Sequence, residues 1–420
     1  MRRLTIAMIA TLLAACGENS GATGSQPVDS ATVDGLRAGP SRLETIPSPA
    51  GAGAAEPFLF ASRDGAVLSW LEPVTGTDRV ALRVARYRDN QWSAPQTIVE
   101  RNDLFVNWAD FPSVIEDAKG TLFAHWLQKS GKGTYAYDVR MASSTDGGTT
   151  WSDSFLLNRD GKEGEHGFVS LVPLPQGGVA AAWLDGRNMK MSEGDGHDDM
   201  GDMTIRYANV DASGTLTSDL NLDARTCECC GTGMTMTAKG PVIVYRDRSP
   251  DNVRDISYIT RNGNEWTEPR AVRADGWKID GCPVNGPQID AIGNRAVTAW
   301  FTAANDQQRV YAAFSDDGGV TFGDAIVVDD GKPVGRVDVV MLDDQTALVS
   351  WLEQTPAGAE IRARRVPRQG KTGRSMKIAE SAAARAAGFA RIARIGDEVW
   401  FTWTEQSADS KQIRVARVRS

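Results

Sequence analysis

A short apolar run that ends in an aromatic residue recurs seven times along this chain. The aromatic residues stand at positions 70, 126, 183, 245, 300, 351 and 403, spaced 51 to 62 residues apart. Each run precedes a second strand of alternating pattern, and six of the seven are followed by a third strand. Units of this length cannot cover their own hydrophobic faces, so they stack on one another. The pattern predicts an all-β propeller, because a large β-sandwich would not repeat seven times at one period.

Two of the repeats carry a sharper signature in the turn before the third strand. Residues 144–151 read STDGGTTW and residues 315–322 read SDDGGVTF. Both segments resemble the Asp-box (BNR) repeat of the sialidase-like propellers. In such a turn the aspartate accepts backbone amides, the glycines take positive φ, and the aromatic side chain fills the seam to the next blade. The resemblance assigns purely structural roles to Asp146, Trp151, Asp317 and Phe322.

The number of blades follows from the strand pairs. Seven pairs predict seven blades, with six, the usual number in sialidases, as the alternative. The seventh pair reaches the C-terminus without an outermost strand. We therefore predict that residues 42–47 add the missing strand and close the ring.

The first residues indicate export. Arg2 and Arg3 precede an apolar run over residues 4–13, which is too short to span a bilayer as a helix. The run ends in Leu-Ala-Ala-Cys, which resembles the bacterial lipoprotein signal box. That resemblance implies cleavage before Cys16, lipidation of its sulfur and an outer-membrane location facing the periplasm or the exterior. An ordinary secretory signal is the alternative.

The segments on either side of the lipid anchor differ in composition. Residues 1–15 are the expected signal peptide, residues 16–55 a flexible tether rich in Gly, Ser, Pro and Ala, and residues 56–420 the propeller. The whole chain has a net charge of −8. This balance argues against nucleic acid as a partner. We expect a monomer that meets the membrane through its lipid and binds a small molecule or glycan.

The order of strands divides the loops between two faces. Strands A to D run outward in each blade, so the D-to-A connections and the B-to-C hairpins share one face, which we call the D-to-A face. Asp146 and Asp317 are expected on the opposite face. His125, inside an apolar strand, is expected to be a packing residue, and the acid-rich stretch 193–202 is either a solvated loop or a cation site. Loops that carry unusual residues mark a candidate site. The predicted ligand-binding residues are Asp110, His166, Asp185, Arg187, Asp247, Arg254 and Arg336.

Four cysteines are expected to meet on the same face. Disulfides are the default in an oxidising compartment. Partners one or two residues apart rarely reach disulfide geometry, so only one bridge, from the cluster to the most distant cysteine, is expected. The remaining sulfurs, near several methionines and His166, would suit copper or zinc. Structural disulfides, a metal or cofactor site and redox chemistry all stay open for Cys227, Cys229, Cys230 and Cys282.

The catalytic pattern of the sialidases is not recognisable. That family binds a carboxylate with three arginines and uses a late tyrosine nucleophile paired with a glutamate. No Arg-Ile-Pro motif opens this propeller, and the last tyrosine is Tyr311. We therefore predict a noncatalytic ligand- or glycan-binding lipoprotein. A lipoprotein that handles copper or zinc and a divergent exo-sialidase-like glycoside hydrolase are the alternatives.

Overall fold

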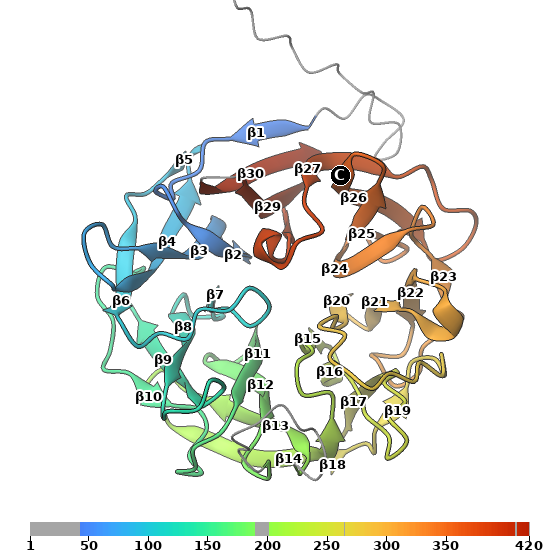
Figure 1. The fold of residues 1–420 in the computed structure, drawn as a ribbon, viewed down its shortest axis with the longest axis horizontal. Helices are drawn as coiled ribbons and strands as arrows, with labels where there is room; N and C mark the ends of the chain where they lie inside the picture. Colours follow the sequence, from blue (N-terminus) through green and yellow to red (C-terminus); the bar gives the residue numbers. More distant parts are fainter. Residues whose placement is uncertain (1–42, 190–200, 264, 408–409, 420) are drawn as a thin grey trace, which may run out of the picture. The chain divides into compact units, whose positions relative to one another are not determined.

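The computed structural model describes residues 43–189, 201–263, 265–407 and 410–419. Over these residues the chain forms seven antiparallel sheets arranged in a ring (Figure 1). No helix in the described part of the chain is long and apolar enough to cross a membrane. The predicted signal peptide, Cys16 and most of the acid-rich stretch lie outside the described residues.

The first four blades follow one another along the chain. Blade 1 contains β2 (Ala55–Ser62), β3 (Gly65–Pro73), β4 (Val80–Arg88), β5 (Gln91–Trp92) and β6 (Gln96–Arg101). Blade 2 contains β7 (Ser113–Glu116), β8 (Leu122–Lys129), β9 (Tyr137–Ser144) and β10 (Phe155–Leu156). Blade 3 contains β11 (His166–Pro173), β12 (Val179–Asp185), β13 (Met203–Val210) and β14 (Leu216–Thr226). Blade 4 contains β15 (Gly233–Thr237), β16 (Gly240–Arg246), β17 (Ile256–Asn262), β18 (Glu265–Trp266) and β19 (Arg270–Ala271).

The last three blades complete the ring. Blade 5 contains β20 (Gln288–Ile292), β21 (Arg295–Thr302), the 3-10 turn η1 (Ala304–Asp306), β22 (Arg309–Ser315) and β23 (Ile326–Val327). Blade 6 contains β24 (Pro333–Met341), β25 (Thr346–Thr355), β26 (Gly358–Pro367) and β27 (Met376–Ser381), and the 3-10 turn η2 (Arg385–Ala387) follows it. Blade 7 contains β28 (Arg391–Ile395), β29 (Glu398–Gln406), β30 (Lys411–Arg419) and β1 (Glu44–Ile46).

The ring is closed by its two ends. β1 pairs antiparallel with β30, with Thr45 opposite Ala416, and the blue strand lies beside the red ones in Figure 1. Both the seven blades and closure by an N-terminal strand are thus confirmed. Because β1 is part of blade 7 and Ala54 is fully buried, the folded domain begins before the predicted boundary at residue 56.

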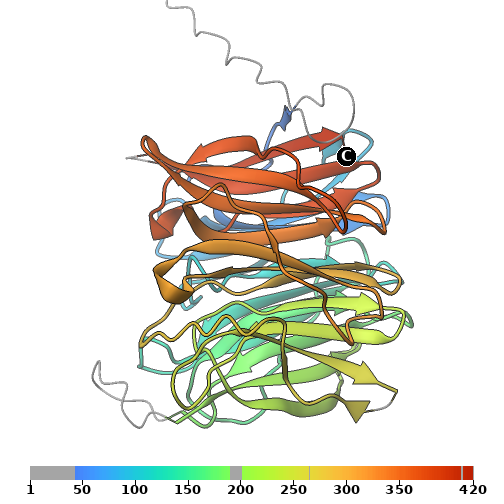
Figure 2. The ribbon, with the colours of Figure 1, turned by 90° about the vertical axis from the view of Figure 1, so that its right-hand side faces the viewer.

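The hydrophobic core lies in the seams between neighbouring blades, which Figure 2 shows from the side. Phe123 of blade 2 and Trp183 of blade 3, for example, belong to one buried cluster. His125 is also fully buried, and its Nδ1 lies 2.9 Å from the Ser113 hydroxyl. Burial lowers the pKa of His125 to about 3, so the ring is neutral and packs as expected. Five of the repeat tryptophans are at most 3% exposed and the sixth, Trp403, is 7% exposed; the five are Trp70, Trp126, Trp183, Trp300 and Trp351.

Both Asp-box turns have the expected hydrogen bonds. The Asp146 carboxylate accepts bonds from the Thr150 amide at 2.9 Å and the Thr150 hydroxyl at 2.6 Å. Asp317 accepts the same pair of bonds from Thr321, at 2.9 and 2.7 Å. Gly148 takes φ of 99°, which a residue with a side chain rarely adopts. These aspartates therefore hold the turns between strands C and D.

The aromatic residues of the Asp boxes fill a different seam from the predicted one. Phe322 of blade 5 meets Tyr258 of blade 4 edge to face, with ring centroids 4.9 Å apart. Trp151 of blade 2 packs against the cluster that contains Val67 and Val84 of blade 1. Each aromatic side chain thus seals the seam to the preceding blade, because the turn after strand C leans back over that neighbour.

Candidate functional site

The D-to-A connections surround the mouth of a central cavity of about 420 Å³. At this end the cavity is lined by residues that stand just before or at the start of the innermost strands. Those near the mouth include Asp110, Phe111, Phe168, Thr232 and Phe389. Because these residues come from four different D-to-A connections or innermost strand ends, with Asp110 and Phe111 in the same one, the site is assembled from segments that are distant in sequence.

A tyrosine held between two carboxyl groups lies beside this mouth. The Tyr137 hydroxyl, at the start of β9, lies 3.0 Å from Asp110 Oδ2 and 3.0 Å from Glu165 Oε1. Asp110 Oδ1 accepts a 2.7 Å bond from the Phe168 amide. Phe105 stacks on the Tyr137 ring, with centroids 4.0 Å apart. Sequence reasoning singled out Asp110 but missed Tyr137, whose only signal was its place directly after a B-to-C hairpin.

The pKa values of Asp110 and Glu165 are both raised to near neutral pH. Burial raises the pKa of Asp110 to about 7 and that of Glu165 to about 8, although both accept a hydrogen bond from Tyr137. Burial also raises the pKa of Tyr137 well above its ordinary value. Within the described part of the chain, neither Asp110 nor Glu165 takes part in an ion pair. This end of the cavity thus presents carboxyl groups with no cation to neutralise them.

His166 is the centre of a separate polar cluster. It is fully buried, with Nδ1 3.2 Å from the Tyr137 carbonyl oxygen and Nε2 3.3 Å from Asp160 Oδ2. Asp185 lies 3.7 Å from the same Nε2 and holds Arg187 through two bonds of 2.7 Å. Burial acts to raise the pKa of Asp185, but the hydrogen bonds from Arg187 and Trp183 and the nearby charges of His166 and Arg187 together outweigh it and hold that pKa below its ordinary value.

This cluster has the donor types of a metal site. Ligand atoms of Asp160, His166 and Asp185 all lie within 4.8 Å of one another. Arg187 forms an ion pair with Asp185, so the negative charge of Asp185 is balanced by the protein itself. The structure therefore brings together His166, Asp185 and Arg187, three of the predicted ligand-binding residues, and Asp160 is the member that sequence reasoning missed.

The predicted arginines each engage a protein partner. Arg336 donates to the carbonyl oxygens of Gly388, Ala383 and Ala384 at 2.9 to 3.1 Å. Burial lowers its pKa to about 10. Arg254 donates to Glu228 at 2.7 Å. These side chains hold the rim loops in place, as Arg187 holds Asp185.

Asp247 lies in a polar pocket of blade 4. Its carboxylate accepts bonds from the Arg248 amide at 2.6 Å and the Ser257 hydroxyl at 2.9 Å. Burial, together with nearby Asp223, raises its pKa. The hydrogen bonds tie the start of the B-to-C hairpin to β17.

An aromatic shelf, formed by Trp108, Phe111 and Phe389, stands at the mouth of the cavity. Trp108 and Phe389 stack with centroids 5.8 Å apart, and Phe111 lies 6.2 Å from Phe389. All three side chains are partly exposed. The Arg336 guanidinium covers the Trp108 ring at 4.9 Å. Sequence reasoning missed the shelf, because its members come from loops 278 residues apart that only the ring brings together.

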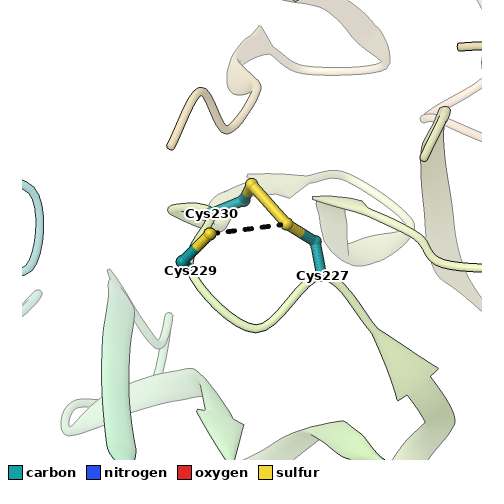
Figure 3. A group of neighbouring side chains, drawn as sticks. All are labelled: Cys227, Cys229 and Cys230. Carbon is teal, nitrogen blue, oxygen red and sulfur yellow. Dashed lines mark hydrogen bonds between the residues drawn. A yellow bond between two sulfur atoms is a disulfide. The ribbon is translucent and has the colours of Figure 1, made fainter. Parts of the chain in front are cut away.

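The cysteines correct the expectation of a single bridge. Cys229 is joined to Cys282, with Cα atoms 6.0 Å apart, and Cys227 is joined to Cys230, with Cα atoms 5.8 Å apart. Figure 3 shows the three clustered residues on one tight loop. A separation of one or two residues disfavours a bridge within the cluster, whereas Cys227 and Cys230 are three residues apart. A turn of the loop over that distance brings their sulfurs together.

The disulfides also bear on the copper or zinc interpretation. Cysteine binds such metals as a thiolate, and all four sulfurs are used in disulfides here. The sulfur atoms of Cys227, Cys229 and Cys230 lie within 4.8 Å of one another. A metal would therefore require prior reduction. Cys229 packs against the cluster that contains Met203 and Met234.

Fold and loop arrangement together define a sialidase-like β-propeller. Residues 74–332 match the family described as BNR repeat-like domain, and the chain belongs to this family. A search of curated proteins found no match.

Several solved structures share the fold. A protein of unknown function from Dyadobacter fermentans DSM 18053 superposes with a TM-score of 0.51 and 14% identity, over 90% of this chain and 99% of that one. The polysaccharide lyase Uly1 superposes with a TM-score of 0.51 and 10% identity, over 94% and 95%. The Hadza microbial sialidase Hz136 is 16% identical with a TM-score of 0.45, over 71% of this chain and 63% of that one. At these identities the likeness shows the fold alone.

Proposed function

We propose that this protein is a noncatalytic glycan-binding lipoprotein whose ligand enters the D-to-A mouth of the central cavity. The observation that carries the proposal is the aromatic shelf of Trp108, Phe111 and Phe389. Partly exposed aromatic rings beside a cavity, with a few polar groups around them, are typical of ligand sites. The apolar face of a sugar ring would lie on the shelf, with its hydroxyl groups toward Asp110 and Thr232.

The charges of the site favour an uncharged glycan. Asp110 and Glu165 have no cationic partner among the described residues, so an anionic ligand would be repelled when either ionises. Two arginines lie over the shelf rings in the described part of the chain. Arg336 is buried and bonded to three carbonyl oxygens, whereas Arg385, 5.9 Å from the Trp108 ring, is exposed. The shelf therefore offers fewer arginines than the three that bind a carboxylate in the sialidase pattern.

Tyr137 is poorly placed to act as a nucleophile. Its side chain is almost fully buried, Phe105 covers its ring, and its hydroxyl is shared between two carboxyl groups. A substrate could not reach the phenol oxygen without displacing one of these partners. This supports a binding role.

A second candidate function is cleavage of a glycan by acid–base chemistry. It is favoured by the pKa values of about 7 for Asp110 and about 8 for Glu165, because general acids and bases work best near the ambient pH. Product release from the same oligosaccharides distinguishes the two functions. Catalysis should disappear in a Glu165→Gln variant, whereas binding alone releases no product.

The binding proposal is tested by calorimetry with defined oligosaccharides. Neutral cello-, xylo- and manno-oligosaccharides are compared with sialyllactose. We expect binding within the neutral set, weakened about tenfold or more by Trp108→Ala, which corresponds to about 1.4 kcal/mol. Asp317→Ala, in a turn on the opposite face, is the matched control and should leave the affinity unchanged. Tighter binding of sialyllactose than of every neutral probe would refute the proposal.

A further inference from the structure

The two disulfides differ sharply in their access to solvent. Cys282 is exposed and Cys229 is half-buried, whereas Cys227 and Cys230 are 0% and 1% exposed. A dissolved thiol can therefore attack the Cys229–Cys282 bridge, but it cannot reach the Cys227–Cys230 bridge directly. Neither bridge forms part of the glycan site proposed above.

The two bridges are close enough to communicate. The sulfur atoms of Cys227 and Cys229 lie 4.0 Å apart, as the dashed line in Figure 3 shows. Arg254 Nη1 lies 3.3 Å from Cys227 Sγ. A cation at this position favours negative charge on the neighbouring sulfurs. Cys229, once released as a thiolate, would therefore face the Cys227 sulfur beside a guanidinium group.

We propose that these four cysteines form a thiol–disulfide exchange site, which takes two electrons from an external dithiol at the exposed Cys229–Cys282 bridge and then moves one of the two new thiols from Cys229 to the buried Cys230. The electron donor is defined by its chemistry as a vicinal or near-vicinal dithiol, small or protein-borne. The site acts independently of glycan binding.

The first exchange occurs at the surface. A thiolate of the dithiol attacks Cys282 Sγ, the Cys229–Cys282 bond breaks, and Cys229 leaves as a thiolate. The second thiolate of the donor then attacks the donor's own sulfur in the mixed disulfide. The donor's internal disulfide forms, and Cys282 leaves as a thiolate that takes up one of the two protons given up by the donor.

The second exchange occurs inside the loop. The Cys229 thiolate attacks Cys227 Sγ, a Cys227–Cys229 bond forms, and Cys230 leaves as a thiolate that takes up the other proton. Because partners two residues apart rarely hold a relaxed bridge, the Cys227–Cys229 bond exchanges back and forth with the Cys227–Cys230 bond. The donor has lost two electrons and two protons, and the protein has gained thiols at Cys282 and Cys230. Cys282 stays reduced, and the second thiol has moved from the half-buried Cys229 to the buried Cys230.

Two variants that lose the same bridge test this transfer. Cys282→Ser keeps the attacking Cys229 sulfur, whereas Cys229→Ser removes it and leaves Cys282 as a free thiol. Each variant is acid-quenched, unfolded and labelled with N-ethylmaleimide, and the labelled cysteines are located by mass spectrometry. We expect label on both Cys229 and Cys230 in Cys282→Ser, and label on Cys282 alone in Cys229→Ser. The label on Cys230 should differ about tenfold or more between the two.

The unaltered protein gives an independent test if either variant fails to fold. Limited reduction with dithiothreitol, followed by the same quench and labelling, should place label on Cys282 and on both Cys229 and Cys230. Label confined to Cys282 and Cys229 would overturn the proposal, because it would mean that the surface bridge opens without exchange. Label confined to Cys229 in Cys282→Ser would overturn it equally.

Discussion

At the scale of single residues, buried carboxylates around the central cavity hydrogen-bond across three of the junctions between neighbouring blades. Asp110 accepts the Phe168 amide of blade 3 at 2.7 Å, and Asp290 of blade 5 accepts the Met341 amide of blade 6 at 2.7 Å. Asp338 of blade 6 accepts the Ile392 amide of blade 7 at 2.9 Å. Asp110 therefore has a structural role besides its place at the candidate site. Burial raises the pKa of Asp110 to about 7 and that of Asp290 to about 6 in spite of these bonds.

The raised pKa of Asp110 predicts a pH-dependent stability. An acid whose pKa is higher in the folded state contributes its full stability below the unfolded pKa, near 3.8, and loses it as pH rises toward about 7. Asp110→Asn removes this titration, so the Tm of the unaltered protein should fall relative to that of the variant as pH rises across this window. Calorimetry at several pH values measures it, with the exposed Asp153→Asn as control. A Tm difference that does not change with pH would contradict the prediction.

At the scale of elements, the ring depends on one short strand. β1 has only three residues, yet it supplies the outermost strand of blade 7 and pairs with β30. Ile46 points into the cluster that joins blade 7 to blade 1 and is 6% exposed, whereas Thr45 is exposed. A propeller opened at this point would leave β30 as an unpaired edge.

Shortening the buried side chain of β1 tests this dependence. Ile46→Ala should lower the free energy of unfolding by about 2 kcal/mol or more, because it removes buried apolar groups and leaves a cavity. Thr45→Ala, on the same strand, should change it by about 0.5 kcal/mol or less. Denaturant titrations of both variants measure the difference. Equal effects of the two substitutions would mean that β1 is not packed as described.

At the scale of the whole molecule, the two disulfides and the acidic surface agree with an exported protein. Disulfides persist in oxidising compartments, and the net charge of −8 disfavours binding to anionic lipid surfaces. Attachment to the outer membrane through Cys16 therefore remains our proposal for localisation, with the lipid as the sole anchor.

Replacing the lipidated cysteine tests this proposal. Cys16→Ser should move the protein from the membrane fraction to the soluble periplasmic fraction, because one acylated residue provides the anchor. Fractionation and immunoblotting measure the shift, and Cys282→Ser serves as a control that keeps Cys16. Unchanged membrane partitioning of Cys16→Ser would exclude the lipoprotein interpretation.

The sequence alone determined the features that depend on local pattern. The sevenfold period predicted the blades, and the missing last strand predicted closure by residues 42–47, because each blade is built from neighbouring segments. The Asp-box aspartates were equally predictable, since all their bonds lie within one turn. The loops of the D-to-A face could also be assigned from the sequence, because the order of strands within each repeat sets which connections share a face.

Only the tertiary structure decided which side chains meet across that face. Asp110, Tyr137 and Glu165 come from three separate segments. Their contact depends on how adjacent blades are placed around the central axis. The sequence predicted a bridge from the cluster to Cys282, but only the structure selects Cys229, 53 residues away, as its partner. The predicted Arg336 turned out to hold a neighbouring loop. Such contacts depend on distances between blades, and no local pattern of residues encodes those distances.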